Sequence, residues 1–268
     1  MPQHEYFNRK LCISVDAEGY GRRDDRAQQD MQETLLRILA AAAGRAHLDR
    51  ATWTRQGVGD EELSLIPLGP SEPLVVDDLP RQLDAELSRV NCGRSPDNRI
   101  RLRVAMNVGV AYPADNGFAG QGVVVVSRLL NSTPVRRALK VARTANLALI
   151  VSAGLFDDVV CQGHTTLGPG DFRRVDVSEK EYQGHAWLRV PGVDVSSLDL
   201  SAAADSVTEA TDPAGTGSAA AEATDRADGA AAPPPAAAPP PAAAVTNQFH
   251  GEVDARYATF GFSGGARG

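Results

Sequence analysis

The most restrictive feature of this sequence is an unbroken alternation of apolar and other residues between positions 100 and 110. The apolar members are Ile100, Leu102, Val104, Met106, Val108 and Val110. A period of two over this length is typical of a β-strand with one face on a hydrophobic core. The alternation therefore predicts a long, half-buried strand in the middle of the chain.

Composition limits where that core can form. From about Ser196 to Ala244 there is scarcely a large apolar side chain, and small residues, proline and acidic residues dominate. Such a segment cannot bury enough surface to offset the entropy of ordering it, and its Pro-Ala stretch favours an extended spacer. We expect an N-terminal tail over residues 1–10, a folded domain over 11–192, a disordered Ala/Pro-rich linker over 193–244 and a short tail over 245–268.

The rest of the domain shows both helical and strand periodicity. Strands are expected at 11–15, 52–56, 63–68, 147–151, 172–177 and 185–190, and helices over about 25–44, 79–90 and 133–145. The run from Val123 to Val126 fits either a strand or a buried helix. The order βαββαβ followed by further elements predicts an α+β fold with a ferredoxin-like sheet and helices on one of its faces.

The charge and the apolar runs of the sequence indicate which kinds of partner to expect, and its cysteines indicate the redox environment. The formal charge is −7, and lysine and arginine are scattered along the chain, so a nucleic-acid partner is not expected. No apolar run approaches the length that spans a bilayer, so no membrane partner is expected either. The three cysteines, Cys12, Cys92 and Cys161, are far apart and lack CxxC spacing, which indicates reduced thiols and a cytoplasmic protein.

Three motifs in order carry a resemblance to a known family. They are Asp16-Ala17-Glu18-Gly19-Tyr20 at the end of the first strand, Gly59-Asp60 in the predicted hairpin turn, and Gly120 with Ser127-Arg128 further on. Together they resemble the class III adenylate and guanylate cyclase homology domain, over about residues 11–192. The resemblance implies a homodimer whose sites lie at the subunit interface and which binds a nucleoside triphosphate.

The resemblance also assigns roles to individual residues. Asp16 and Asp60 would hold Mg²⁺ or Mn²⁺, Glu18, Gly19 and Tyr20 would contact the phosphates, and Arg128 would stabilise the reacting phosphorus. Two divalent cations between carboxylates suit cyclisation of a nucleoside triphosphate, because they activate the 3′-hydroxyl and stabilise the pyrophosphate. Gly19 at a strand-to-helix turn would let backbone N–H groups reach a phosphate at the helix N-terminus.

The sequence departs from the family pattern at positions that select and orient the nucleotide. Gln56 stands where a base-reading lysine is usual, Gly117 and Ala119 replace an acid and a tryptophan, and Val124 replaces an asparagine that orients the ribose. Losing an orienting contact typically costs about 10²-fold in rate. Two interpretations stay open: a signalling domain that binds nucleotide or metal with weak or no turnover, and an active cyclase with altered base recognition.

The last segment has its own pattern. Apolar residues alternate with polar residues or glycine from Val245 to Tyr257, and Phe260 and Phe262 follow among glycines. This pattern resembles bacterial amyloid signalling motifs, which template a matching β-fold in a partner protein. A disordered end with chance alternation is the alternative.

Overall fold

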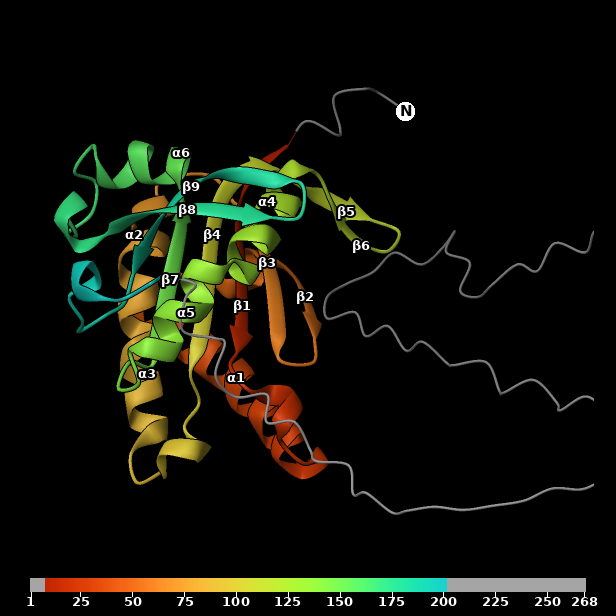
Figure 1. Cartoon of the computed structure of the whole chain (residues 1–268). Coiled ribbons are helices and arrows are strands. Elements are labelled where there is room, and N and C mark those ends of the chain that lie inside the picture. The colour runs from red at the N-terminus through yellow and green to blue at the C-terminus, as the bar shows by residue number, and fades with distance from the viewer. Residues whose placement is uncertain (1–7, 202–268) are drawn as a thin grey trace, which may run out of the picture. The chain divides into compact units, whose positions relative to one another are not determined.

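The computed structural model describes residues 8–201. The predicted interaction tail over 245–268 and most of the predicted linker lie outside these residues. A seven-stranded sheet in the order β2-β3-β1-β4-β7-β9-β8 forms the centre of the domain (Figure 1). Its strands are β1 (Arg9–Ala17), β2 (Thr54–Val58), β3 (Glu61–Pro67), β4 (Leu102–Val110), β7 (Leu147–Ser152), β8 (Arg173–Glu179) and β9 (Tyr182–Arg189).

The helices connect these strands. They are α1 (Asp25–Arg45), α2 (Glu72–Val76), α3 (Asp78–Asn91), α4 (Gln121–Asn131), α5 (Thr133–Val141) and the short α6 (Ala153–Leu155). A two-stranded hairpin of β5 (Tyr112–Ala114) and β6 (Gly117–Ala119) precedes α4. No helix among residues 8–201 is long and apolar enough to cross a membrane.

The predicted ferredoxin-like unit is confirmed. The succession β1-α1-β2-β3-α3-β4 places its strands in the order β2-β3-β1-β4, and β1 pairs antiparallel with both β3 and β4. Strand β7 then joins β4 in parallel, and the β8–β9 hairpin completes the sheet. The long strand predicted from the alternation is β4, which is central and pairs on both sides.

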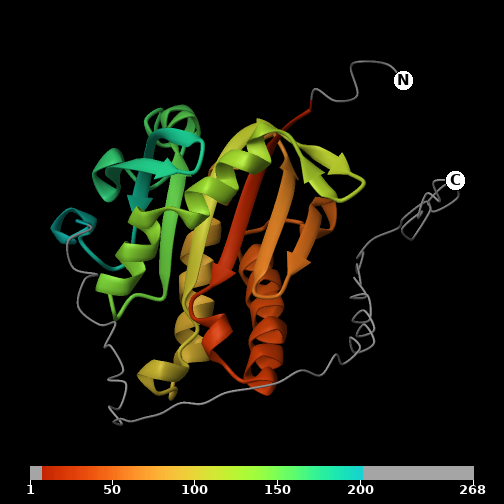
Figure 2. The same ribbon diagram turned by 45° about the vertical axis from the view of Figure 1, so that its right-hand side comes forward.

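Side chains of the sheet enter two separate cores. In β7, Leu147, Leu149 and Val151 join the core under α1 and α3, whereas Ala148 and Ile150 join the core under α4 and α5. Helices α1 and α3 therefore cover one face, as predicted for the βαββαβ unit. Helices α4 and α5 add a layer on the opposite face, which the prediction did not include (Figure 2).

The ambiguous valine run is helix α4, and glycines allow its close approach to β4. A Cβ atom on Gly122 would lie 2.9 Å from the carbonyl carbon of Gly109 and 3.1 Å from the Cys12 sulfur. A Cβ on Gly109 would lie 2.7 Å from the Gly122 Cα. Glycine at both positions is what permits this backbone contact, which buries the helix against the sheet.

Residues after position 192 also pack on the domain, and the predicted boundaries of the domain and the linker stay predictions. A 3₁₀-turn, Val195–Ser197, lies in this stretch. Val195 is buried and Leu198 and Leu200 pack on the second core, while Arg173 donates to the Leu198 carbonyl at 2.6 Å. Apolar residues in this short stretch thus extend the second core beyond position 192.

Candidate functional site

The first predicted metal ligand, Asp16, is buried near the end of β1. It stands in register between Glu61 on β3 and Arg103 on β4, and it is 8% exposed. Arg103 donates Nε to Asp16 Oδ1 at 2.7 Å and Nη2 to Oδ2. The carboxylate is thus held on both oxygens by one guanidinium, the geometry of a bidentate ion pair.

Burial makes Asp16 hard to ionise. Desolvation raises its pKa to about 6, although the charge and hydrogen bonds of Arg103 act in the opposite direction. The neighbouring carboxylates of Asp60 and Glu61 raise the pKa further. A carboxylate in such surroundings gains from any additional cation nearby.

The second predicted metal ligand, Asp60, lies in the turn between β2 and β3. Its carbonyl accepts a hydrogen bond from the Ala17 N–H at 3.2 Å, which ties the turn to the end of β1. Burial raises the pKa of Asp60, and the charge of Arg103 lowers it. The charge of Arg103 therefore lowers the pKa of both acids, and the charge of Asp60 raises the pKa of Asp16. We call Asp16 and Asp60 the acid pair.

The acid pair suits a hard divalent cation. Mg²⁺ is commonly bound by one or two carboxylates together with substrate phosphates and water. Among residues 8–201, no three histidine, cysteine, aspartate or glutamate side chains are grouped to hold a metal by themselves. A cation at the acid pair would therefore share its coordination with a ligand, and Arg103 supplies the positive charge next to both acids.

The loop after β1 exposes its backbone. Gly19 adopts a positive φ of 77°, and the N–H groups of Gly19 and Gly21 donate no hydrogen bond to any described residue. The Arg22 guanidinium lies over Gly19, where a Cβ would come within 3.0 Å of Nη2. Two free N–H groups and a guanidinium are typical of a site for an anion.

This loop does not lead directly into a long helix, as the sequence suggested. It forms the three-residue 3₁₀-turn Tyr20–Arg22, and α1 begins only at Asp25. The N-terminus of α1 is already capped, because the Asp24 carboxylate accepts from the Ala27 N–H at 2.8 Å. The α1 N-terminus is therefore occupied by an acid of the chain, and the free donors belong to the preceding loop.

Tyr20 joins the loop to the hairpin turn that carries Asp60. Its ring packs on Gly59, whose φ is 62° and whose Cβ, if present, would lie 3.7 Å from the ring. The hydroxyl accepts from the side chain of Gln32 on α1. The side chain of Tyr20 thus has a structural role in bringing the two motifs together.

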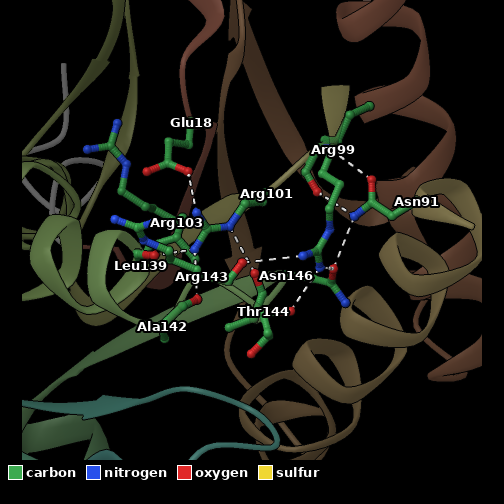
Figure 3. Close-up of polar contacts among 12 residues, drawn as sticks. Glu18, Asn91, Arg99, Arg101, Arg103, Leu139, Ala142, Arg143, Thr144 and Asn146 are labelled. Carbon is green, nitrogen blue, oxygen red and sulfur yellow. Dashed lines mark hydrogen bonds and ion pairs between the residues drawn. The ribbon is translucent and has the colours of Figure 1, made fainter. Parts of the chain in front are cut away.

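Glu18 is engaged with Arg101 (Figure 3). Arg101 donates Nη1 to Glu18 Oε2 at 2.9 Å, and its other nitrogens reach the carbonyls of Leu139, Ala142 and Ala145 at the end of α5. The Glu18 N–H is also used, since it donates to the Arg101 carbonyl at 2.9 Å. Glu18 therefore connects β1 to the α5–β7 loop, and its predicted phosphate contact stays a prediction.

Two of the departures from the family pattern meet in space. Gln56 lies on β2, and its amide covers Gly117 in the β5–β6 hairpin, where a Cβ would come within 2.5 Å of Gln56 Oε1. Gly117 has a φ of 97°, which also disfavours any side chain there. At the two positions where the family pattern has a lysine and an acid, this chain has a glutamine amide that packs against a glycine.

Arg128 lies on α4 and is paired with Glu181. Its Nε and Nη2 donate to Glu181 Oε1 at 3.2 and 2.7 Å, and Glu181 belongs to the β8–β9 turn. No hydrogen bond or ion pair joins Arg128 to Asp16 or Asp60 within the described part of the chain. The resemblance implies that Arg128 and the two acids come from opposite subunits of a homodimer, and the role of Arg128 stays a prediction.

Sequence reasoning missed Arg101 and Arg103. Arg103 lies in β4 and Arg101 directly precedes it; both belong to the apolar alternation and lie on the side of Ala105, which enters the second core. A charged residue on a strand that pairs on both sides needs a partner, because an unpaired buried charge is costly. The alternation itself therefore signalled that these arginines need partners, and the structure shows that the partners are Glu18 and Asp16.

Comparison with known proteins gives structural similarity only. No family model and no curated protein matches the sequence. Among solved structures, an adenylate/guanylate cyclase/hydrolase from Silicibacter pomeroyi is 17% identical, with a TM-score of 0.46 over 69% of this chain and 99% of that chain. The guanylyl cyclase Cya2 is 12% identical, with a TM-score of 0.45 over 72% and 98%. The adenylyl cyclase CyaB from P. aeruginosa is 13% identical, with a TM-score of 0.43 over 68% and 94%.

Proposed function

We propose that the domain is a divergent, cyclase-like signalling module that binds a nucleoside triphosphate together with Mg²⁺ or Mn²⁺ at the acid pair. The observation that carries this proposal is that a buried acid, Asp16, and a half-buried acid, Asp60, both have raised pKa values and both experience the positive charge of Arg103. Burying a carboxylate beside a second acid is energetically costly, and groups with pKa values perturbed in this way are candidates for function.

The neighbouring groups fit the rest of the ligand. A cation between Asp16 and Asp60 would neutralise their charges and those of a triphosphate, which leaves the Arg103 guanidinium available to a phosphate oxygen. The Gly19 and Gly21 N–H groups and Arg22 supply further donors in the adjoining loop. Gln56 supplies an amide that can donate to and accept from a base.

Turnover is proposed to be weak or absent. Val124 is partly buried on α4, one helical turn before Arg128, and its side chain offers no hydrogen bond to a ribose. Orientation of the attacking hydroxyl is among the largest contributions to such a reaction. The alternative is an active cyclase that makes a 3′,5′-cyclic nucleotide and pyrophosphate, and the presence of Asp16, Asp60 and Arg128 favours it.

Calorimetric titration with Mn²⁺ and each nucleoside triphosphate tests the proposal. Wild type should bind nucleotide in a Mn²⁺-dependent manner, and Asp16→Ala should weaken binding at least about tenfold, the scale of one lost charge contact. Asp176→Ala is the matched control, because that carboxylate is 92% exposed on β8. Binding that is unchanged in Asp16→Ala would refute the site.

An assay for cyclic product separates the two functional interpretations. Val124→Asn should raise product formation if orientation of the ribose limits the rate, whereas robust product from wild type would favour the active cyclase. Product that is equal in wild type and Asp60→Ala would exclude the acid pair from either interpretation.

The assembly and location of the protein are part of the same proposal. Because Arg128 pairs with Glu181 and forms no hydrogen bond or ion pair with the acid pair among the described residues, a homodimer with Arg128 supplied by the second copy would complete the site, and a cytoplasmic location fits the expected reduced thiols. Light scattering of the purified protein tests the dimer. A monomer at every concentration, with or without Mn²⁺ and nucleotide, would contradict it.

Residues 245–268 are proposed to recruit a partner protein by templating a β-fold. The support is the alternation of apolar residues with polar residues or glycine in the sequence. A peptide of residues 245–268 should form thioflavin-positive fibres. A peptide that stays monomeric would contradict this role.

A further inference from the structure

A pocket outside the acid pair opens between the start of α1 and the segment that follows α3. Its volume is about 380 Å³, and its polar lining consists of Arg23, Asp30, Arg94, Ser95 and Asn98. The first turn of α1 and the last turn of α3 lie at the same end of the domain (Figure 2). The volume is within the range of small-molecule sites. We call it the arginine pocket.

Backbone carbonyls hold both arginines in place. Arg23 donates Nη2 to the Arg99 carbonyl at 3.1 Å, and Arg94 donates Nε to the Val90 carbonyl at 3.0 Å and Nη1 to the Asn98 carbonyl at 3.2 Å. Neither forms an ion pair with a carboxylate of the described residues. Each guanidinium is thus oriented by neutral partners, and its remaining N–H donors are left for a ligand.

The positive charges of the arginines at the pocket repel one another. Burial lowers the pKa of Arg23 most, and the nearby charges of Arg94 and Arg22 lower it further. A bound anion would relieve this repulsion between cations. Asp30 is the acidic side chain in the lining, and its negative charge would repel an anion. Binding of an anion therefore requires the attraction of the two arginines to exceed this repulsion.

We infer that the arginine pocket binds the phosphate group of a small molecule across Arg23 and Arg94. A phosphate dianion matches two cations, and its oxygens accept from two guanidinium groups at once. Arg94 also lines a neighbouring pocket of about 330 Å³ with Arg37, which offers space for the rest of the ligand. No hydrogen bond or ion pair joins either arginine to the acid pair within residues 8–201, and Asp16 and Asp60 do not line this pocket.

Titration of the full chain with inorganic phosphate, without divalent cation, tests the inference by ¹H–¹⁵N NMR. The amide signals of Gly93 and Ser95 should shift in wild type. Arg94→Ala and Arg23→Ala should each weaken binding about tenfold. Asp30→Asn should tighten it several-fold by removing repulsion, a gain that misfolding cannot produce.

Two controls separate this site from others. Arg174→Ala removes an exposed arginine on β8 and should leave phosphate binding unchanged. Asp16→Ala should also leave it unchanged, so failure of the nucleotide proposal and failure of this one are distinguishable. Absence of shifts at Gly93 and Ser95 in wild type, or an Arg94→Ala affinity equal to wild type, would overturn the inference. Acetate binding as tightly as phosphate would overturn the assignment to phosphate.

Discussion

At the scale of single residues, the positive charge of Arg103 compensates the negative charges of the acid pair when no cation is bound. The Arg103 side chain is 17% exposed and that of Asp16 is 12% exposed, so the ion pair between Arg103 and Asp16 is largely shielded from water. Removing one partner of a buried pair leaves an uncompensated charge. Arg103 is therefore a structural requirement of the free domain as well as a candidate ligand contact.

Arg103→Ala is expected to lower the free energy of unfolding by about 3 kcal/mol, the scale for breaking a buried pair. Saturating Mn²⁺ should restore part of this loss, because a cation at the acid pair replaces the missing charge. Urea unfolding with and without Mn²⁺ measures both effects. Arg174→Ala serves as the exposed control, and no difference between these two variants would argue against a buried pair.

The raised pKa of Asp16 predicts the pH dependence of cation binding. Below its pKa of about 6 the carboxyl holds a proton, which competes with the cation, so affinity should fall about tenfold between pH 7 and pH 5. The pKa of Asp16 is higher in the folded state, about 6, than in the unfolded chain, about 4. The free energy of unfolding should therefore fall as pH rises from about 4 to about 6, because the folded state holds the proton more tightly than the unfolded chain does.

Mn²⁺ binding followed by electron paramagnetic resonance at several pH values checks this prediction. Wild type should lose affinity on acidification, and the remaining binding of Asp16→Ala should be flatter over the same range. An affinity of wild type that is constant between pH 7 and pH 5 would show that Asp16 is not the titrating ligand.

At the scale of elements, the contact between α4 and β4 depends on two glycines. A Cβ on Gly122 meets backbone at 2.9 Å, so Gly122→Ala should lower the free energy of unfolding by about 1–3 kcal/mol through overpacking. Gly44→Ala on α1 is the matched control, because a Cβ atom there would have no neighbour within 4 Å. Thermal unfolding should show a lower midpoint for Gly122→Ala alone, and equal midpoints would contradict the close packing.

The elements that sequence reasoning predicted well are those whose two faces differ in residue type. Helix α3 has one face on a core, and strand β4 places large apolar side chains in the core under α1 and α3 and small or polar side chains toward α4. Helix α4 was ambiguous, since Val123 to Val126 suit a strand by propensity and the decisive contact of Gly109 with Gly122 is a tertiary one. The β5–β6 hairpin was missed because three-residue strands carry almost no periodic signal.

The candidate site was predictable only in part. The acid pair was found because strand ends and hairpin turns of adjacent strands meet in a ferredoxin-like sheet. The ion pairs of Asp16 with Arg103 and of Glu18 with Arg101 follow from the pairing of β1 with β4, which local patterns do not contain. The ion pair of Arg128 with Glu181 joins α4 to the β8–β9 turn, which is also a contact between segments far apart in the sequence.

At the scale of the whole molecule, the domain should be complete at Leu200. A chain of residues 1–200 is expected to unfold with the same free energy as the full chain, whereas residues 1–192 should lose about 2–4 kcal/mol from the missing burial of Val195 and its neighbours. Urea unfolding of the three chains tests the boundary. Equal stability of 1–192 and 1–200 would place the end of the domain earlier.

A divalent cation between Asp16 and Asp60 is the feature on which the proposed function depends. Paramagnetic Mn²⁺ broadens amide signals near its site, so titration of ¹⁵N-labelled protein locates the cation directly. We expect selective loss of the Ala17, Gly19 and Asp60 amide signals, with those of Gly154 and Asp176 retained. Broadening at other positions with these three signals intact, or the same broadening in Asp16→Ala, would contradict a cation at the acid pair.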